Sequence, residues 1–171
     1  MICGDSNLNN LDKATPTNFQ LIFPKVPTES SISANNPFVM NIFSAVIPGV
    51  SFSEDDRRWQ GNISKASMNP MTFDSWQVSY VVDSNLANWK LIFNWMSYIN
   101  NNNNKIAEFH KQYAVDVAFV ATGNYKQSVL ELLFIGVWPS QLGEVSFNYR
   151  EGDVQLEGSV TFSYDYFRLN K

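Results

Sequence analysis

Alternation of apolar and polar residues constrains the fold of this chain more than any other feature. Trp76, Val78, Tyr80 and Val82 are separated by single residues and should point one way, while Gln77, Ser79 and Asp83 point the other. A longer stretch at 154–166 alternates in the same way. Successive side chains of a β-strand point to opposite faces, so a period of two predicts half-buried strands. We therefore expect a fold dominated by β-structure.

Shorter apolar runs predict further strands, because prolines, glycines and asparagines separate them. We place these strands at 19–23, 38–43, 113–122, 128–136 and 145–149. The run at 128–136 is almost continuously apolar, which is typical of a strand buried on both faces. Pro139 is expected to end this strand, Trp138 to fill a gap in the core, and Gly143 to permit a backbone angle that other residues resist.

One helix is expected at 84–99, with Asp83 or Ser84 as its cap. Its polar residues recur every three or four positions, as a solvated stripe would, and the opposite stripe is apolar. The apolar stripe, expected to be the packing face, consists of Leu86, Trp89, Phe93 and Met96. The remaining organisation is a polar N-terminal arm at 1–18 and a single β domain at 19–171.

The densest charge of the chain lies in a predicted projecting hairpin at 50–67. A tryptophan follows this cluster of charged residues. The six candidate contact residues are Glu54, Asp55, Asp56, Arg57, Arg58 and Trp59. A solvated loop tip with ion pairs among neighbours is one interpretation. A contact surface is the other, because arginine and tryptophan are enriched in protein interfaces.

The chain lacks the usual parts of an enzyme or a metal site. Cys3 is the only cysteine and His110 the only histidine among 171 residues. Neither has the partner that a disulfide, a zinc site or a Cys–His nucleophile requires. With a net charge of −4, a broad phosphate-binding surface is also disfavoured. We expect no catalysis, no metal and no cofactor.

Targeting and membrane segments are not expected either. The N-terminus has no basic and apolar signal segment, and no apolar run approaches the roughly 20 residues of a membrane-spanning helix. Folding in a cytoplasm, without membrane insertion, is the expectation.

The stretch at 154–166 poses an edge problem. Thirteen residues at about 3.3 Å each would span roughly 40 Å, about twice a typical strand. An open edge of this length invites association with another strand. Closure within the chain and closure between identical chains both solve this problem, and the alternation does not choose between them.

Four segments resemble the tail tube proteins of contractile-tailed bacteriophages. They are MTFDSWQVSYVVDS at 71–84, WKLIFNWMSYI at 89–99, FIGVWPSQLGEVSFNY at 134–149 and VQLEGSVTFSYDYF at 154–167. The family pattern of a G-x-W-P loop, an L-G-E strand start and a final aromatic Asp-Tyr pair is matched by Gly136, Trp138, Pro139, Leu142, Gly143, Glu144, Asp165 and Tyr166.

This resemblance implies an antiparallel β-sandwich or small barrel with one flanking helix. Subunits of the family form homohexameric rings whose strands join into one inner barrel, and the rings stack into a tube through which DNA passes without specific binding. Type VI secretion tubes are built on a related fold. The implied partners are further copies of the chain, the tail sheath, the baseplate and the tail terminator, in a virion assembled in the host cytoplasm.

The resemblance also suggests roles for particular residues. The charged hairpin becomes a candidate contact with the next ring. The polar face of the final strand becomes the candidate lining of the channel, with facing the sheath as the alternative. Its residues are Gln155, Glu157, Ser159, Thr161, Ser163 and Asp165.

Two other functions remain open at this point. A baseplate protein that starts the tube would use the same fold but form one ring per virion. A carbohydrate-binding β-sandwich would instead expose aromatic platforms such as Trp59 and Tyr125.

Overall fold

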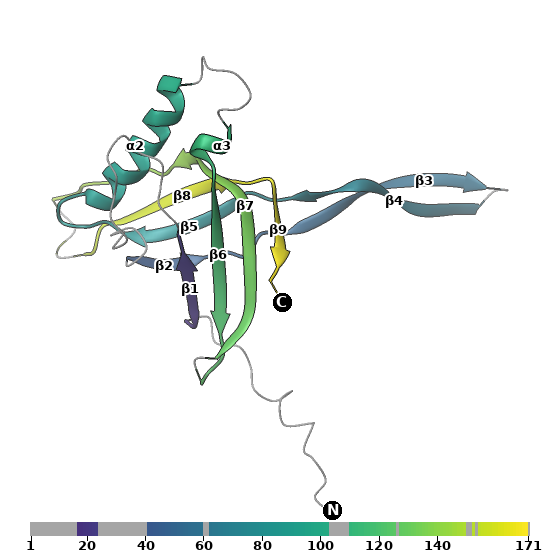
Figure 1. Cartoon of the computed structure of the whole chain (residues 1–171), viewed down its shortest axis with the longest axis horizontal. Coiled ribbons are helices and arrows are strands. Elements are labelled where there is room, and N and C mark those ends of the chain that lie inside the picture. The colour runs from purple at the N-terminus through teal and green to yellow at the C-terminus, as the bar shows by residue number, and fades with distance from the viewer. Residues whose placement is uncertain are drawn as a thin grey trace, which may run out of the picture.

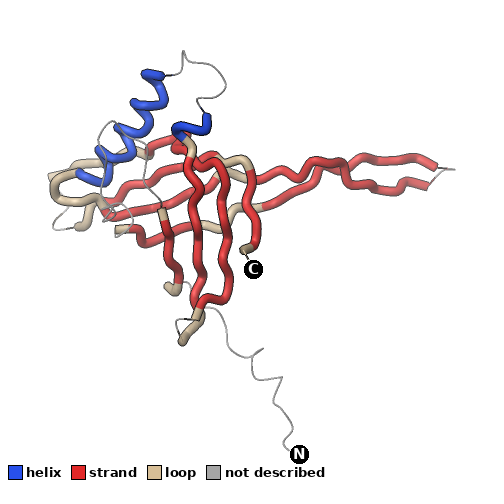
Figure 2. Tube along the Cα trace, viewed as in Figure 1, coloured by secondary structure: helices blue, strands red, loops and turns tan. Residues whose placement is uncertain are grey.

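The computed structural model describes residues 17–23, 41–59, 62–102, 110–125, 127–149, 152 and 154–170. Most of the body is strand, and the two helices among the described residues lie at one end (Figure 2). In chain order the elements are β1 (Phe19–Ile22), β2 (Ile42–Ala45), β3 (Val50–Trp59), β4 (Asn62–Phe73), β5 (Trp76–Val81), α2 (Ala87–Asn102), α3 (His110–Tyr113), β6 (Val115–Thr122), β7 (Ser128–Leu142), β8 (Glu157–Ser163) and β9 (Tyr166–Leu169). The fold is mainly β with one main helix, as the sequence predicts. Cys3 and most of the predicted N-terminal arm lie outside the described residues.

The body strands are joined in the order β1-β6-β7-β8-β5-β2, and β9 also pairs with β7. All of these pairings are antiparallel. In Figure 1, β6 and the first part of β7 lie vertically, whereas β5 and β8 run across the page. We call β2, β5, β8 and the end of β7, Trp138–Leu142, the four-stranded layer.

The two parts of β7 run in different directions because the strand bends near Gly136. The residue has a φ of 70°, a left-handed conformation that favours glycine. The register with β6 shifts here, and the Gly136 N–H donates a hydrogen bond of 3.0 Å to Asp116 Oδ1. The bulge therefore turns the second part of β7 from β6 toward β8.

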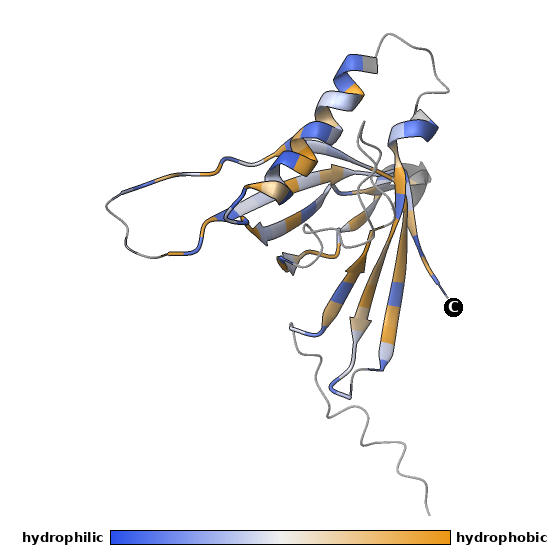
Figure 3. Cartoon of the chain, turned by 60° about the vertical axis from the view of Figure 1, so that its left-hand side comes forward, coloured by the Kyte–Doolittle hydropathy of each residue, from blue (hydrophilic) through white to orange (hydrophobic). Residues whose placement is uncertain are grey.

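The core is an aromatic stack between the sheet and α2. Trp76 stacks on Phe134 with ring centroids 4.4 Å apart, and it also contacts the ring of Phe162. Trp95 of α2 is fully buried, and its indole N–H donates to the Tyr113 carbonyl oxygen at 2.9 Å. Hydrophobic residues colour most of the body strands in Figure 3, while the turn between β6 and β7 is hydrophilic.

The predicted packing face of the helix is only partly right. Leu86 and Met96 pack against the core. The buried hydrophobic residues of α2, however, are Leu91, Ile92 and Trp95, and Phe93 is 49% exposed. The side chain of Asn88, rather than that of the predicted cap Asp83 or Ser84, links the start of the helix to β5. Its Nδ2 donates to the Val81 carbonyl oxygen at 2.7 Å, and its Oδ1 accepts the Asp83 N–H at 3.2 Å.

The predicted single strand at 154–166 is also wrong, because it divides into β8 and β9. Residues 154–156 are irregular, and the chain turns at Tyr164 and Asp165. β8 pairs with β5 on one side and β7 on the other, so most of it is not an edge. The stretch therefore does not form one long open edge, and the edge problem inferred from its length does not arise.

Three other strand predictions change. β7 continues through Pro139 to Leu142, because Pro139 lies at a register shift and the strand pairs only with β8 there. The segment 145–149 forms no regular strand. β2 begins at Ile42 rather than residue 38, and residues 38–40 lie outside the described part. Among the described residues, no helix has the length and apolar character needed to cross a membrane.

Candidate assembly surfaces

The outer face of the four-stranded layer carries small polar side chains. In β8, residues 158, 160 and 162 are buried, while the alternate residues are exposed or half-buried. Ser159 pairs with Ser79, and Thr161 pairs with Gln77 on one side and Gln141 on the other. Alternation thus places Gln77, Ser79, Gln141, Ser159, Thr161 and Ser163 on one face, with Glu157 at its end. These side chains provide hydrogen-bonding groups with a single charge.

Four of the six candidate channel-lining residues share this face. Glu157, Ser159, Thr161 and Ser163 alternate along β8. Gln155 precedes the strand and Asp165 lies in the turn after it; both are exposed. The alternation of the sequence therefore extended the predicted face by two residues, Gln155 and Asp165, that lie beyond the ends of β8.

Among the described residues, the same layer has an open edge at each end. There β2 pairs with β5 on one side only. The segment after it stays attached to β5 through the Val46 N–H, which donates to the Gln77 carbonyl oxygen at 3.2 Å. At the other end, Trp138–Leu142 pairs with β8. In the part of the chain that the structure describes, no strand pairs with the other side of Trp138–Leu142.

β3 and β4 form a separate two-stranded hairpin that projects from the body (Figure 1). All six charged-cluster candidates, from Glu54 to Trp59, lie in β3. The paired strands run continuously to Trp59, opposite Asn62. Lys65 Nζ lies 2.6 Å from Glu54 Oε2, an ion pair across the two strands. The charged residues are therefore part of an extended strand rather than of a loop.

Aromatic residues anchor the base of this hairpin to the body. Phe73 lies 5.2 Å from Phe167 between ring centroids, and Tyr164 packs edge-on against Phe134. The Tyr164 hydroxyl donates to the Asp74 carbonyl oxygen at 2.7 Å. Burial, together with the negative charge of Asp74, raises the pKa of Tyr164 to about 12, so the hydroxyl stays protonated and able to donate. These contacts fix where the hairpin leaves the body.

The family motif serves the path of β7. Gly136 has the special backbone angle that was expected at Gly143. Gly143 instead allows close approach: its N–H donates to the Ser159 carbonyl oxygen at 2.7 Å, and an added Cβ would lie 2.1 Å from Ser159 Oγ. Trp138 packs edge-on against Tyr113. Leu142 and Glu144 lie where β7 leaves the layer.

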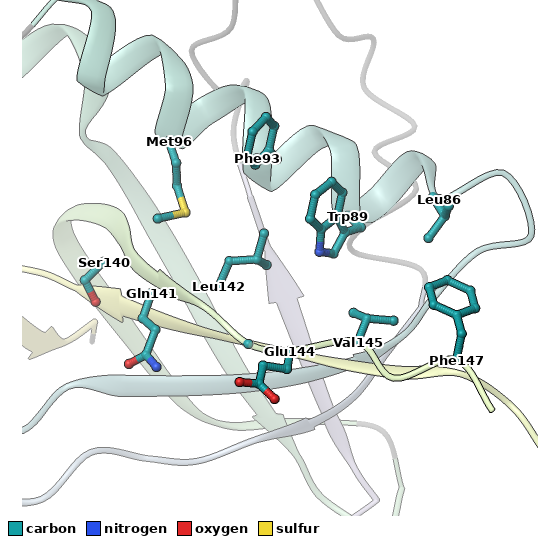
Figure 4. Close-up of a pocket in the computed structure, with 11 residues that line it drawn as sticks. Leu86, Trp89, Phe93, Met96, Ser140, Gln141, Leu142, Glu144, Val145 and Phe147 are labelled. Carbon is teal, nitrogen blue, oxygen red and sulfur yellow. The ribbon is translucent and has the colours of Figure 1, made fainter.

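An apolar groove of about 760 Å³ lies between α2 and the end of β7. Figure 4 shows its helix side chains facing the strand and the segment that follows it. The helix contributes Leu86, Trp89, Phe93 and Met96, and the facing side includes Leu142, Val145 and Phe147. Leu86 has a φ of 57°, a strained conformation for a residue other than glycine. The stripe predicted to face the core therefore lines an open groove, although Leu86 and Met96 also pack against the core.

Sequence reasoning missed this groove and the close contact at Gly158. A Cβ at Gly158 would lie 2.9 Å from Cζ of Tyr80, its partner across β5 and β8. A glycine inside a strand pattern is a signal of close approach, and Gly158 interrupts the alternation between Leu156 and Val160. The groove had no comparable signal, because an apolar helical stripe is the same whether it is covered or open.

Of the two aromatic platforms considered for carbohydrate binding, Tyr125 is 83% exposed, in the turn between β6 and β7. Trp59 is the last residue of β3. In Figure 1 the end of β3 and the turn between β6 and β7 lie at different extremities of the molecule, so the fold does not bring these two positions together.

Comparisons with known proteins agree with this architecture. The family model described as "Phage tail tube protein" matches residues 14–170. The tail tube terminator protein of Enterobacteria phage T4 is 27% identical over 167 residues, which cover 94% of this chain and 90% of that protein.

Two solved structures are similar over nearly their whole lengths. The tube terminating cap of the anti-feeding prophage has a TM-score of 0.65 at 12% identity, covering 99% of each chain. A chain of the sheath/tube terminator of an extracellular contractile injection system has a TM-score of 0.62 at 13% identity, covering 93% of this chain and 97% of that one. From the family match over residues 14–170, this chain belongs to the phage tail tube protein family.

Proposed function

We propose that the chain is a tail tube terminator: a structural virion protein that forms a homohexameric ring on the end of a tail tube. The two open edges of the four-stranded layer carry this proposal. The layer presents one strand, β2, at one side and Trp138–Leu142 at the other. Both are short, so the edge of one copy can pair with the opposite edge of the next.

Strand direction supports closure into a ring. The strands alternate in direction across the four-stranded layer, so β2 runs opposite to the end of β7. A β2 placed beside the β7 end of the next copy would continue the antiparallel pattern. Repetition around an axis would remove both open edges of the four-stranded layer, which is the benefit of a closed barrel.

The terminator role is favoured over the tube body, which was the first expectation from the resemblance. A curated relative that covers most of the chain is a tail tube terminator, and two similar solved structures are a terminator and a terminating cap. In this role the hairpin contacts the last ring of the tube, and the tail sheath and baseplate are partners in the same particle.

The polar face of the four-stranded layer would line the channel for DNA during ejection. Hydroxyl and amide side chains dominate it, and Glu157 is its only charged member. Without cations, such a surface does not neutralise phosphates or release counterions. A duplex would therefore pass through without specific binding.

Electron microscopy of the purified protein at high concentration tests the proposal. Single six-membered rings that do not elongate, but that cap purified tail tubes, are expected. Long tubes formed by this protein alone would replace the terminator role with that of a tube-body subunit.

The position in the particle separates the terminator from a tube-initiating ring. Gold-labelled antibody against this chain should mark the tail end opposite the baseplate. Label at the baseplate would favour the initiator instead.

A further inference from the structure

The groove under α2 and an apolar surface at the other end of the four-stranded layer have matching chemistry. Exposed hydrophobic residues follow β2 into the start of β3, and each is about half exposed. We call them the apolar strip: Phe43 (47%), Ile47 (48%), Val50 (45%) and Phe52 (48%). A contiguous patch of this kind on a soluble protein commonly marks an interaction site.

We propose that, in the ring, the apolar strip of one copy fills the groove under α2 of the next copy. This inference rests on the ring proposed above and specifies what seals each junction. The occupant is a second copy of this chain, bound head to tail.

The small size of the strand edge makes such a seal necessary. β2 has four residues, and at about 3.3 Å each they span roughly 13 Å. A stable interface buries on the order of 800 Å² on each partner. Strand pairing over so short an edge does not reach that area, so further surface beside it must take part.

The groove lies where that further surface is needed. Ser140, Gln141 and Leu142 line it, and they also form the open edge of β7. In Figure 1, β2 lies on the far side of the layer from the end of β7 and α2, so one chain does not fill its own groove with its own strip. A neighbour whose β2 pairs with Trp138–Leu142 would bring its apolar strip alongside the groove.

Charge favours this partner. Of the described residues that line the groove, Glu144 is the only charged one, and the apolar strip contains none. Burying the two surfaces against each other therefore removes few charges from water, whereas a charged partner would lose its hydration there. An apolar surface is the chemistry that the groove accepts at least cost.

Two substitutions separate the halves of the junction. Ile47→Glu damages the strip and leaves the groove intact, and Phe93→Glu does the reverse. Both side chains are about half exposed, so the monomer fold should tolerate either change. Each variant alone should sediment as a monomer at concentrations at which the unaltered chain forms rings, with the assembly midpoint raised at least about tenfold.

Mixing the two variants tests the head-to-tail arrangement directly. In an equal mixture, the intact strip of the Phe93→Glu copy can enter the intact groove of the Ile47→Glu copy. The remaining strip and groove of that pair are both damaged. The mixture should therefore stop at one-to-one dimers in analytical ultracentrifugation, because a heterologous contact cannot close with one good junction.

The control is Tyr125→Glu, which introduces the same charge at an exposed aromatic residue outside both surfaces. It should form rings like the unaltered chain, and circular dichroism should show all variants folded. If the unaltered chain forms rings and the Ile47→Glu and Phe93→Glu variants do so equally well, the strip-and-groove contact is overturned but the ring stands. If the folded, unaltered chain remains a monomer, the ring proposal fails as well.

Discussion

At the scale of single residues, glycines set how closely the strands of the four-stranded layer approach one another. Gly158 lies under the ring of Tyr80, and Gly143 lies against the backbone of Ser159. Gly136 has a different role, since its positive φ allows the bend of β7. Gly158 and Gly143 are therefore glycines because a side chain would lack space, and Gly136 is one because of its backbone angle.

Gly158→Ala should destabilise the monomer by about 1–3 kcal/mol, as overpacking of a core does. The added Cβ would lie 2.9 Å from Tyr80 Cζ, and Tyr80 is fully buried, so its ring has little room to move. Urea denaturation monitored by tryptophan fluorescence measures the change in free energy of unfolding. Gly152→Ala is the matched control, because nothing lies within 4 Å of a Cβ added at that position. Equal stability of the two variants would contradict the contact.

At the scale of elements, the alternation predicted β5 and the middle of β8 well. Val160 and Phe162 are buried as expected, because the strand is paired over their whole length. The alternation continues past both strand ends, where hydrogen bonds redirect the chain: the Asp165 N–H donates to the Ile135 carbonyl oxygen at 3.0 Å. A residue pattern records which side chains are apolar and not where pairing stops.

The helix shows the limit of the same reasoning. An apolar stripe was identified correctly, but α2 buries the adjacent stripe of Leu91, Ile92 and Trp95. Both stripes are apolar, so the sequence alone does not rank them; the position of Asn88 against β5 does. The surface left open is the helix side of the groove.

The hairpin formed by β3 and β4 should contribute to assembly rather than to the monomer fold. Within the described part of the chain, its strands pair only with each other, outside the sheet of the body. Reversing two of its charges with Arg57→Glu/Arg58→Glu should therefore prevent attachment to tail tubes. The melting temperature should stay within about 2 °C, because β3 is not part of the sheet of the body. Co-sedimentation with purified tubes measures attachment.

A control for net charge is available elsewhere. Lys111→Glu/Arg168→Glu makes the same change in charge at exposed residues of α3 and β9. This variant should still bind tube ends. Normal attachment of the Arg57→Glu/Arg58→Glu variant would show that these arginines are not part of the contact.

At the scale of the whole molecule, the polar face and α2 lie on opposite sides of the four-stranded layer. If the polar face lines the channel, Thr161→Lys adds one positive charge per copy inside the ring. Rings of this variant should bind linear duplex DNA more tightly, with affinity that falls steeply as salt rises, because the lysines would displace counterions. Fluorescence anisotropy over a salt series measures this.

Asn94→Lys places the same charge on the exposed side of α2, outside the proposed channel. It should change DNA binding much less than Thr161→Lys. If both variants bind DNA alike, the polar face does not line the channel.

The position of β8 has a consequence for synthesis of the chain. β8 follows β5 and β7 in sequence but lies between them in the sheet. Before the ribosome has translated Glu157–Ser163, β5 and β7 lack β8, the strand that pairs with both of them. Val160 and Phe162 are also absent from the core at that stage. The nascent chain therefore exposes unpaired strands that can aggregate until this late segment emerges. Translation that stops before β8 should yield insoluble protein, since the middle of the sheet is the last large part to be made.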